Sequence, residues 1–528
     1  MSFRRSHAGL LVLLSLTFLW ALHNRFVQDD AFISFRYARN LVDGHGLVFN
    51  PGERVEGYTN FLWTVLMAVP LALDVDPVRF SWVVGLLLFP GSIYLTYRIG
   101  RSLSRRRDVG WMAAGLTGAN FSYSAWATGG METQAQSFLF LAVARLLVLV
   151  ADRPSYPRLL LFSFAAAAAF LLRMDSAVLI APALAAVSAA LWRPRRPARL
   201  LAALLPAALI AGAWMAWKIG YYGRLLPNTF FAKATGATVL PGLYFAALYA
   251  FSYGLPLIVP FAVRPILRDR PRPDLATGFV LAVTVLWIAY VAAVGGDFME
   301  FRLMVPVIPF ISVFAAWTVA TVFPKPSARI AWMLVFGAIS LFHSQRDRLY
   351  GVETVRALER HVREGGWIEA GRALRAHLAG SDVVIATTAA GAIPFYSELT
   401  TIDMLGLNDA WVARHGQTAR TPSRRWLGEK PGHQKKAPLR YLMDRRVNLL
   451  IGHPRVVPPA SRTFARSDFV GDAFWQLDAL PDRGVRVVEI PIREDAVLVA
   501  LYLREHPDVE SAIARKRWRV YPVNGQPP

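Results

Sequence analysis

The chain has 528 residues, of which 55% are hydrophobic and only 18% charged, whereas a soluble domain carries about 25% charged residues. Several apolar runs between residues 8 and 343 approach the roughly 20 residues needed to cross a bilayer, so the composition excludes an ordinary soluble protein and indicates a polytopic membrane protein. The net charge of +22 lies mostly in short clusters between apolar runs, which favours topology signals over a nucleic-acid partner, and the absence of cysteine excludes disulfides and Cys-ligated metal sites.

The apolar runs predict about eleven membrane spans. The first run follows Arg4 and Arg5 and lacks a convincing cleavage site of small residues, so we expect an uncleaved span instead of a signal peptide. The run 61–73 is too short for a crossing, so we assign it to an interfacial or re-entrant helix within a long first external loop, 24–78. The expected spans are 7–23, 79–98, 109–128, 131–150, 157–172, 176–192, 199–217, 241–263, 275–294, 302–323 and 328–343.

Basic clusters between the spans set the expected orientation. They lie at 4–5, 98–107, 153–158, 193–199, 264–272 and 325–329. The positive-inside rule places them in the cytoplasm, and an odd number of spans then sends the chain after residue 343 to the external side.

The pattern changes after the last span. We expect an amphipathic helix over 352–378, a buried strand over 383–386 and a polar, basic loop region over 411–440. The fold class is therefore an α-helical polytopic membrane domain, 1–343, with a mixed α/β extracytoplasmic C-terminal domain, 344–528.

The first chemistry-bearing feature is the carboxylate pair Asp29 and Asp30, which opens a predicted helix over 31–42. The helix dipole favours the ionised carboxylates, whereas each carboxylate raises the pKa of its neighbour. The pair could supply a base or a ligand, and plain N-capping of the helix is the alternative.

The loop 44–60 has the glycine-rich, polar composition of a binding loop. Glu56 is its favoured functional residue, because Tyr58 and Phe61 would hold it at the membrane interface near the Asp pair. His45 could be an acid, a base or a ligand, but a single loop histidine is more often a surface residue.

The loop 218–240 carries Lys218, Arg224 and Lys233 on the side where basic residues are disfavoured, with Asn228 and Thr229 between them. A phosphate-bearing ligand would need such cations and hydrogen-bond donors. The alternative for Lys218 is that its side chain simply extends from the span to the interface.

Further charged residues end spans on the same side. They include Glu132, Arg173, Asp175, Asp297, Glu300 and Arg302. Charged groups at such positions are costly to bury and are functional candidates by default. A structural pair between Asp297 and Arg302 is the alternative for these two.

Taken together, the motifs resemble a known family. They are Asp29-Asp30, Gly44-x-Gly46-x-Val48-Phe49-Asn50 continuing to Glu56, Gly130-Met131-Glu132, Arg173-x-Asp175, Tyr221-Tyr222-Gly223, Pro227-Asn228-Thr229, Ala232-Lys233, Gly295 to Met299, Arg302, Gly391-Ala392-Ile393-Pro394 and Ile402 to Leu407. The set resembles membrane glycosyltransferases of the GT-C fold, and most of all the mycobacterial terminal arabinofuranosyltransferases. The residues after Glu56 differ from those enzymes, which leaves the sugar open.

The resemblance implies a glycosyltransferase that moves a sugar, with arabinofuranose as the example, from a polyprenyl-phosphate donor to a cell-envelope glycan, glycolipid or protein acceptor on the external membrane face. It implies a multi-pass protein of the bacterial inner membrane, with the lipid bilayer as a partner and no nucleic acid. No cofactor is expected; a divalent metal ion at Asp29 and Asp30 is possible but not required.

The resemblance also implies roles for individual residues. Asp29 is expected to be the catalytic base and Asp30 its supporting carboxylate. The expected substrate-binding residues are Glu56, Arg173, Asp175, Arg224, Asn228, Lys233, Asp297 and Arg302, of which Lys233, Arg224 and Arg302 would stabilise the departing lipid phosphate.

Two other function classes remain open from the sequence. A polysaccharide polymerase or ligase would share the topology and a lipid-linked substrate. A lipid-linked sugar transporter tends to have related halves and helices interrupted near the midplane, whereas here the polar groups gather at one membrane face.

Overall fold

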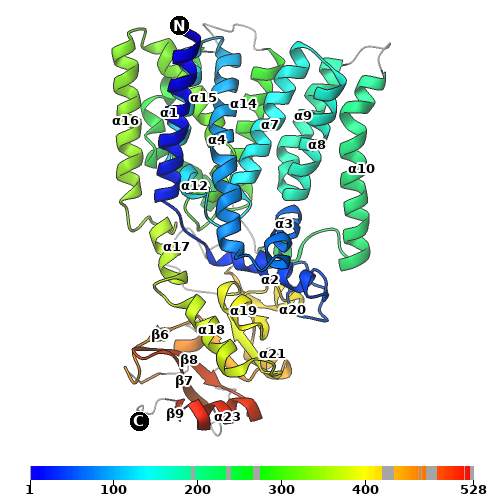
Figure 1. Ribbon diagram of the computed structural model, residues 1–528, viewed down its shortest axis with the longest axis vertical. Coiled ribbons are helices and arrows are strands. Elements are labelled where there is room, and N and C mark those ends of the chain that lie inside the picture. The colour runs from blue at the N-terminus through cyan, green and yellow to red at the C-terminus, as the bar shows by residue number, and fades with distance from the viewer. Residues whose placement is uncertain are drawn as a thin grey trace.

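The computed structural model describes residues 2–191, 197–233, 239–265, 274–418, 433–461, 463–464, 467–470, 485–516 and 518–523. A bundle of long helices forms one part of the molecule, and a smaller domain of strands and short helices adjoins one end of it (Figure 1). The N-terminus lies at the opposite end of the bundle (Figure 1). We call these the domain end and the distal end of the bundle.

A helix overlaps each of the expected spans. The bundle helices are α1 (Ser2–His23), α4 (Pro77–Ser104), α5 (Arg107–Ala119), α7 (Thr133–Asp152), α8 (Tyr156–Leu172), α9 (Ala177–Leu191), α10 (Pro197–Tyr222), α12 (Val239–Ser252), α14 (Leu275–Ala293), α15 (Ile308–Val322) and α16 (Pro326–Ser344). By length and composition, 6 helical segments among the described residues are long and apolar enough to cross a membrane, and the others are shorter. The chain is therefore built as a multi-pass membrane protein, while the number of crossings stays a prediction.

Three expected spans differ from the helices in detail. The span 241–263 is broken, because α12 ends at Ser252 and Gly254, with φ of 67°, leads into the short 3-10 turns η2 (Leu255–Leu257) and η3 (Val259–Phe261). The span 109–128 is interrupted at Asn120, whose side chain caps the separate helix α6 (Phe121–Ala125). The span 302–323 starts late, since η4 (Arg302–Met304) precedes α15.

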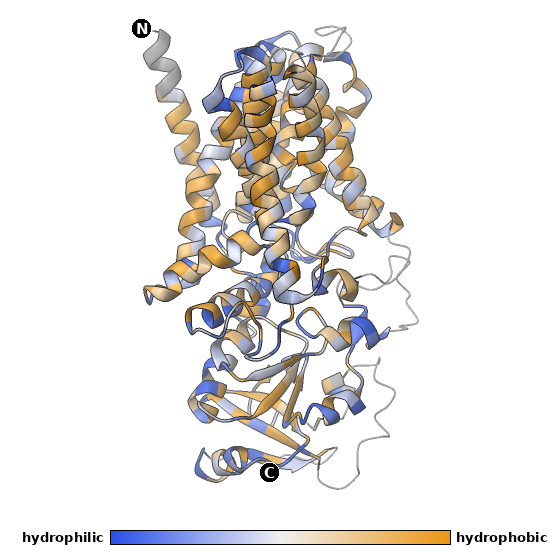
Figure 2. Cartoon of the chain, turned by 90° about the vertical axis from the view of Figure 1, so that its right-hand side faces the viewer, coloured by the Kyte–Doolittle hydropathy of each residue, from blue (hydrophilic) through white to orange (hydrophobic). Residues whose placement is uncertain are grey.

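The distal end holds basic turns. Arg329 on α16 pairs with Asp108 on α5 at 2.7 Å, and Arg106 beside it donates to the Ala320 carbonyl at 3.1 Å. Two of the expected basic clusters therefore lie together. Residues 193–196 and 266–272, which belong to two further clusters, lie outside the described residues. Hydrophobic residues dominate the bundle between its two ends (Figure 2).

At the domain end, two short helices lie between the bundle and the C-terminal domain (Figure 1). They are α2 (Asp29–Val42) and α3 (Phe61–Ala72). The expected interfacial helix over 61–73 corresponds to α3. Both helices belong to the proposed first external loop, and α2 packs against α19 (Ala392–Ser397) of the C-terminal domain.

The C-terminal domain is a mixed α/β structure, as expected. Its strands are β1 (Val384–Thr387), β2 (Thr400–Asp403), β5 (Leu449–Gly452), β6 (Val456–Val457), β7 (Arg486–Arg493), β8 (Ala496–Tyr502) and β9 (Arg519–Pro522), which form a 7-stranded sheet of order β2-β1-β5-β8-β7-β9 with β6 on β8. β1 is parallel to β2 and β5, and the remaining pairs are antiparallel. Every residue of β8 is buried, in keeping with its central place and apolar sequence.

The helices of this domain differ from one expectation. The predicted helix over 352–378 is two helices, α17 (Val355–Val362) and α18 (Trp367–Leu378), because Gly366 between them has φ of 68°. The remaining elements are α20 (Ala410–His415), β3 (Gln417–Thr418), β4 (Lys435–Lys436), α21 (Leu439–Asp444), α22 (Ser467–Val470) and α23 (Pro507–Lys516). Most of the predicted loop region 411–440 lies outside the described residues, which omit 419–432.

One hydrophobic core spans the boundary between the two parts. Phe32 and Phe35 of α2 are fully buried, and their rings lie 5.7 and 6.1 Å from that of Phe395 in α19. Full burial of a side chain of this size stabilises by about 1.5–3 kcal/mol. The helix that begins with the Asp pair is therefore fixed to the C-terminal domain by its apolar face.

Candidate active site

The Asp pair forms the first turn of α2. The side chain of Gln28 caps the helix by accepting a hydrogen bond from the Asp30 backbone N–H, so Asp29 and Asp30 are already helical. Successive residues of an α-helix are rotated by roughly 100°. The two carboxylates consequently face different parts of the molecule.

Asp29 faces the C-terminal domain. Its two carboxylate oxygens accept hydrogen bonds from the backbone N–H groups of Gly391, at 3.1 Å, and Ala392, at 2.8 Å. Burial raises the pKa of Asp29 to about 7, although these donors act in the opposite direction. Asp29 does not line the cavity described below. Asp29, the expected catalytic base, therefore lies outside the cavity, whereas Asp30 lines it.

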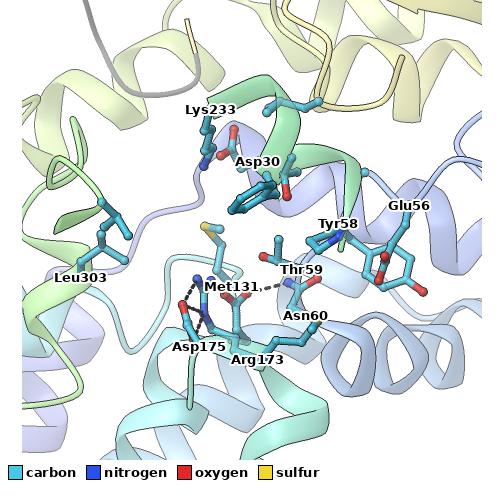
Figure 3. Close-up of a pocket in the computed structure, with 18 of the residues that line it drawn as sticks. Asp30, Glu56, Tyr58, Thr59, Asn60, Met131, Arg173, Asp175, Lys233 and Leu303 are labelled. Carbon is cyan, nitrogen blue, oxygen red and sulfur yellow. Dashed lines mark hydrogen bonds and ion pairs between the residues drawn. The ribbon is translucent and has the colours of Figure 1, made fainter. Parts of the chain in front are cut away.

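A cavity of about 460 Å³ opens at the domain end of the bundle. It is lined by residues from α2, from the loop before α3, from the turn before α7, from η1 (Met174–Ser176), from α10, α11 (Asn228–Lys233) and α14, and from the turn after α14. Its charged lining residues are Asp30, Glu56, Glu132, Arg173, Asp175, Lys233, Asp297 and Arg302. These side chains come from separate segments between residues 30 and 302, and the fold brings them to one chamber, in which Figure 3 labels Asp30, Glu56, Arg173, Asp175 and Lys233.

Arg173 organises one wall of the cavity. Its guanidinium pairs with Glu132 at 2.5 Å and with Asp175 at 2.6 Å. Asn60 donates to the other oxygen of Glu132 at 2.6 Å, and Tyr290 donates to Asp175 at 3.2 Å. Bidentate, charge-assisted contacts of this kind fix side-chain geometry, so the wall presents a rigid polar surface.

The turn after α14 brings a further ion pair. Asp297 and Arg302 are joined at 2.7 Å, which is the structural pair considered as an alternative, and both side chains also line the cavity. Gly296 has φ of 73°, and a Cβ at this position would lie 2.6 Å from the Cβ of Phe245. The glycine allows the turn to fold tightly against α12. Nε of Arg302 has no hydrogen-bond partner among the described residues, so this cation keeps a free donor.

Glu56 is held by another ion pair. Lys218 lies 3.0 Å from Glu56, is completely buried, and also contacts the Met174 sulfur at 3.2 Å. The inward position rules out the alternative that Lys218 extends to the membrane interface. Burial raises the pKa of Glu56 to about 7, although Lys218 opposes the shift.

Asp30 and Lys233 lie near each other at one end of the cavity (Figure 3). Within the described part of the chain, no hydrogen bond reaches the Asp30 carboxylate. Burial raises the pKa of Asp30 above its usual value, while the positive charges of Arg302 and Lys233 oppose the shift. Asp30 is thus a carboxylate with unused acceptor capacity beside two cations.

Two expected binding residues lie outside the cavity. Arg224 is exposed and does not line it. The amide of Asn228 donates instead to the backbone carbonyls of Gly406, Leu407 and Asp409. Arg224 lies after the end of α10 and Asn228 begins α11, so neither side chain reaches the chamber that Lys233, at the end of α11, lines.

Other lining residues were not assigned a role from the sequence. The sequence marks Glu132 as a charged functional candidate without a particular role, and Asn60 only as part of a polar loop. Tyr290 lies in an apolar span with no local signal, and only the folded structure reveals its contact with Asp175.

The described residues contain one group with the geometry to hold a metal ion. It consists of Asp382, His506 and Asp508 in the C-terminal domain. None of the three lines the cavity.

Sequence comparisons support the resemblance noted above. The chain is 30% identical over 327 residues to a terminal beta-(1->2)-arabinofuranosyltransferase of Mycobacterium tuberculosis, an alignment covering 53% of this chain and 50% of that protein. It is 26% identical over 331 residues to the Corynebacterium glutamicum protein of the same name, covering 54% and 47%. The chain therefore spans about half the length of the curated relatives that it matches. Residues 353–517 match a family model described as a domain of unknown function (DUF8728).

Solved structures show the fold. ArnT from Cupriavidus metallidurans bound to undecaprenyl phosphate superposes with a TM-score of 0.55 at 13% identity, covering 93% of this chain and 97% of that one. Arabinofuranosyltransferase AftD from Mycobacteria gives a TM-score of 0.50 at 15% identity, covering 95% and 40%. The chain has a GT-C-like membrane fold and resembles the terminal arabinofuranosyltransferases, which confirms the recognition made from the motifs.

Proposed function

We propose that the chain is a glycosyltransferase that moves a sugar from a polyprenyl-phosphate donor to a glycan, glycolipid or protein acceptor of the cell envelope. The names of the sequence relatives support glycosyl transfer and favour arabinofuranose as the sugar. The undecaprenyl phosphate bound to a protein of the same fold supports a lipid-phosphate donor. The membrane is the bacterial inner membrane, and the domain end of the bundle faces its external side.

The observation that carries the proposal is the composition of the cavity. Asp30 offers a carboxylate with free acceptor capacity, and Lys233 and Arg302 add two cations beside it. Transfer from a lipid phosphate requires one group that accepts a proton and others that stabilise a departing phosphate. The cavity contains both kinds of group, with Asp30 as the proton acceptor and Lys233 and Arg302 as the cations.

The reaction is a single displacement. The Asp30 carboxylate takes the proton of the acceptor hydroxyl, and the hydroxyl oxygen forms a bond to the anomeric carbon of the donor. The bond between that carbon and the phosphate oxygen breaks, and the lipid phosphate leaves with the bonding electrons. Lys233 and Arg302 stabilise the charge on the phosphate, so the displacement requires no metal ion.

The remaining polar walls bind the sugars. Glu56, held by Lys218, and the Arg173 network present fixed acceptors and donors for hydroxyl groups. Asp297 fixes Arg302. Such preorganised groups position reactants without reorganising during the reaction.

The test is to incubate the purified protein with polyprenyl-phosphate arabinofuranose and, separately, with a polyprenyl-phosphate hexose, each with a cell-envelope glycan acceptor. We expect the arabinofuranose donor to be consumed with equal formation of polyprenyl phosphate and extended glycan. Asp30→Asn is the matched control. Failure of both donors to release polyprenyl phosphate would overturn the proposal, and consumption of the hexose donor alone would overturn the choice of sugar.

A further inference from the structure

A segment of the C-terminal domain reaches the two elements that carry Asp30 and Lys233. The segment is 391–409, which includes α19 and β2 and lies within the region matched to a domain of unknown function. It contacts α2 and α11 through hydrogen bonds of buried polar side chains, and Leu407 from it lines the cavity.

The contact with α2 has two parts. The Asp29 carboxylate accepts the N–H groups of Gly391 and Ala392. Arg36, two turns further along the helix and 5% exposed, donates to the carbonyls of Pro394 and Leu399. Charge-assisted hydrogen bonds are stronger than neutral ones, so α2 is held at two points on one face.

The contact with α11 is concentrated on one residue. Asn228 is 4% exposed, and its amide nitrogen lies 2.8 Å from the Gly406 carbonyl, 3.0 Å from that of Leu407 and 3.2 Å from that of Asp409. Asn228 is the first residue of α11, and Lys233 is the last. The position of this short helix therefore depends on the same segment that holds α2, together with α20, from which Arg414 donates to the side-chain oxygen of Asn228 at 3.2 Å.

We propose that segment 391–409 is a positioning element of the transfer site, which sets the Asp30 carboxylate and the Lys233 ammonium group relative to each other. Asp29 and Asn228 are positioning residues: the first acts through Asp30 and the second through Lys233. The inference rests on the proposed function and assigns a role to the C-terminal domain. A misplacement of about 1 Å in a catalytic constellation can cost on the order of 10² in rate, so such an element matters for catalysis.

The test uses Asn228→Ala and undecaprenyl phosphate alone as the probe, with binding followed by tryptophan fluorescence because Trp214 lines the cavity. We expect Asn228→Ala to weaken binding about tenfold or more and to lower the transfer rate on the order of 10²-fold. In a Lys233→Ala background, Asn228→Ala should weaken binding no further, because residues that act through one another are not additive. If Asn228→Ala does not fold, Asn228→Ser, which keeps a smaller polar side chain, replaces it.

The matched control is Asn448→Ala. Asn448 lies in the C-terminal domain, is also 4% exposed, and its side chain hydrogen-bonds the backbone of Val384 and Arg504. This substitution should lower thermal stability without changing the affinity for undecaprenyl phosphate. Wild-type affinity in Asn228→Ala, or an equal loss with and without Lys233, would overturn the inference. Absence of transfer from every donor would overturn the proposed function instead. The affinities of the wild type, the two single variants and the double variant for undecaprenyl phosphate would still decide the inference.

Discussion

At the first turn of α2, the helical rotation directs two neighbouring carboxylates to different partners. Asp29 accepts two backbone N–H groups of the C-terminal domain, whereas Asp30 lines the cavity. Of the two neighbouring carboxylates, one therefore lines the cavity and the other attaches the helix to the C-terminal domain.

This division predicts the outcome of matched substitutions. Asp30→Asn should lower turnover by about 10² to 10⁴, because the general base is lost, and should retain binding of the lipid phosphate. Asp29→Asn should lower turnover less, since one amide oxygen remains to accept a backbone N–H. The measurement is the transfer rate of each purified variant. Wild-type turnover in Asp30→Asn would mean that Asp30 is not the catalytic base, which would then have to be Glu56, Asp175 or Asp297.

A second prediction compares Lys233, which lines the cavity, with Lys325, which lies at the distal end. Lys233→Ala should weaken use of the lipid-phosphate donor severely, because a cation beside the leaving phosphate is removed. Lys325→Ala, at an exposed position of the distal end, should have little effect. Donor KM and kcat of the two variants are the measurement, and equal losses per folded protein would refute the assignment of Lys233.

The pH dependence follows from the same groups. Burial raises the pKa of Asp30, and the base acts only when ionised, so kcat/KM should rise with pH along an acid limb whose midpoint lies above the ordinary value of about 3.9. Lys233 lowers the pKa of Asp30. Lys233→Ala should therefore move the acid limb to higher pH, and Lys325→Ala should not. An unchanged limb in Lys233→Ala would contradict the proximity of the two groups.

At the scale of elements, the approach of α19 to α2 depends on a glycine. A Cβ added to Gly391 would lie 1.9 Å from the Asp29 backbone oxygen, a distance that neither backbone can accommodate without moving. The α2 helix is thus held in place by the closeness of the two backbones as well as by hydrogen bonds.

We expect Gly391→Ala to lower the transfer rate on the order of 10²-fold, because α2 and Asp30 must shift. Gly337→Ala in α16, where an added Cβ has nothing within 4 Å, is the control and should leave the rate unchanged. Transfer rates and melting temperatures of both variants are compared. A wild-type rate for Gly391→Ala would show that α2 can move without consequence.

At the scale of the whole molecule, charge and hydropathy divide the protein into two ends and an apolar middle (Figure 2). Basic turns gather at the distal end, whereas the cavity and the C-terminal domain occupy the other end. The positive-inside rule gives this division an orientation.

Reporter fusions test that orientation. Alkaline phosphatase, which is active only outside the cytoplasm, should be active when fused after residue 345 and inactive when fused after residue 105. The opposite result would reverse the topology and place the cavity on the cytoplasmic face.

Much of the fold follows from local pattern. Apolar runs predicted the positions of the bundle helices, and the change of pattern after residue 343 predicted a mixed α/β domain, because hydropathy and periodicity act along the chain. Breaks at Asn120, Gly254 and Gly366 were missed, since capping and positive φ depend on geometry that hydropathy does not record.

The sequence by itself determined the membrane class, the separation of basic turns from the charged candidates, and, through its motifs, the resemblance to the GT-C glycosyltransferases. Only the tertiary structure decided which member of the Asp pair lines the cavity, that Lys218 is paired with Glu56, and that Asn228 contacts the C-terminal domain. The physical reason is that the residues in these contacts lie far apart along the sequence. The hydrogen bond from Ala392 to Asp29 joins residues 363 positions apart, and no local periodicity specifies which side chains meet across such a separation.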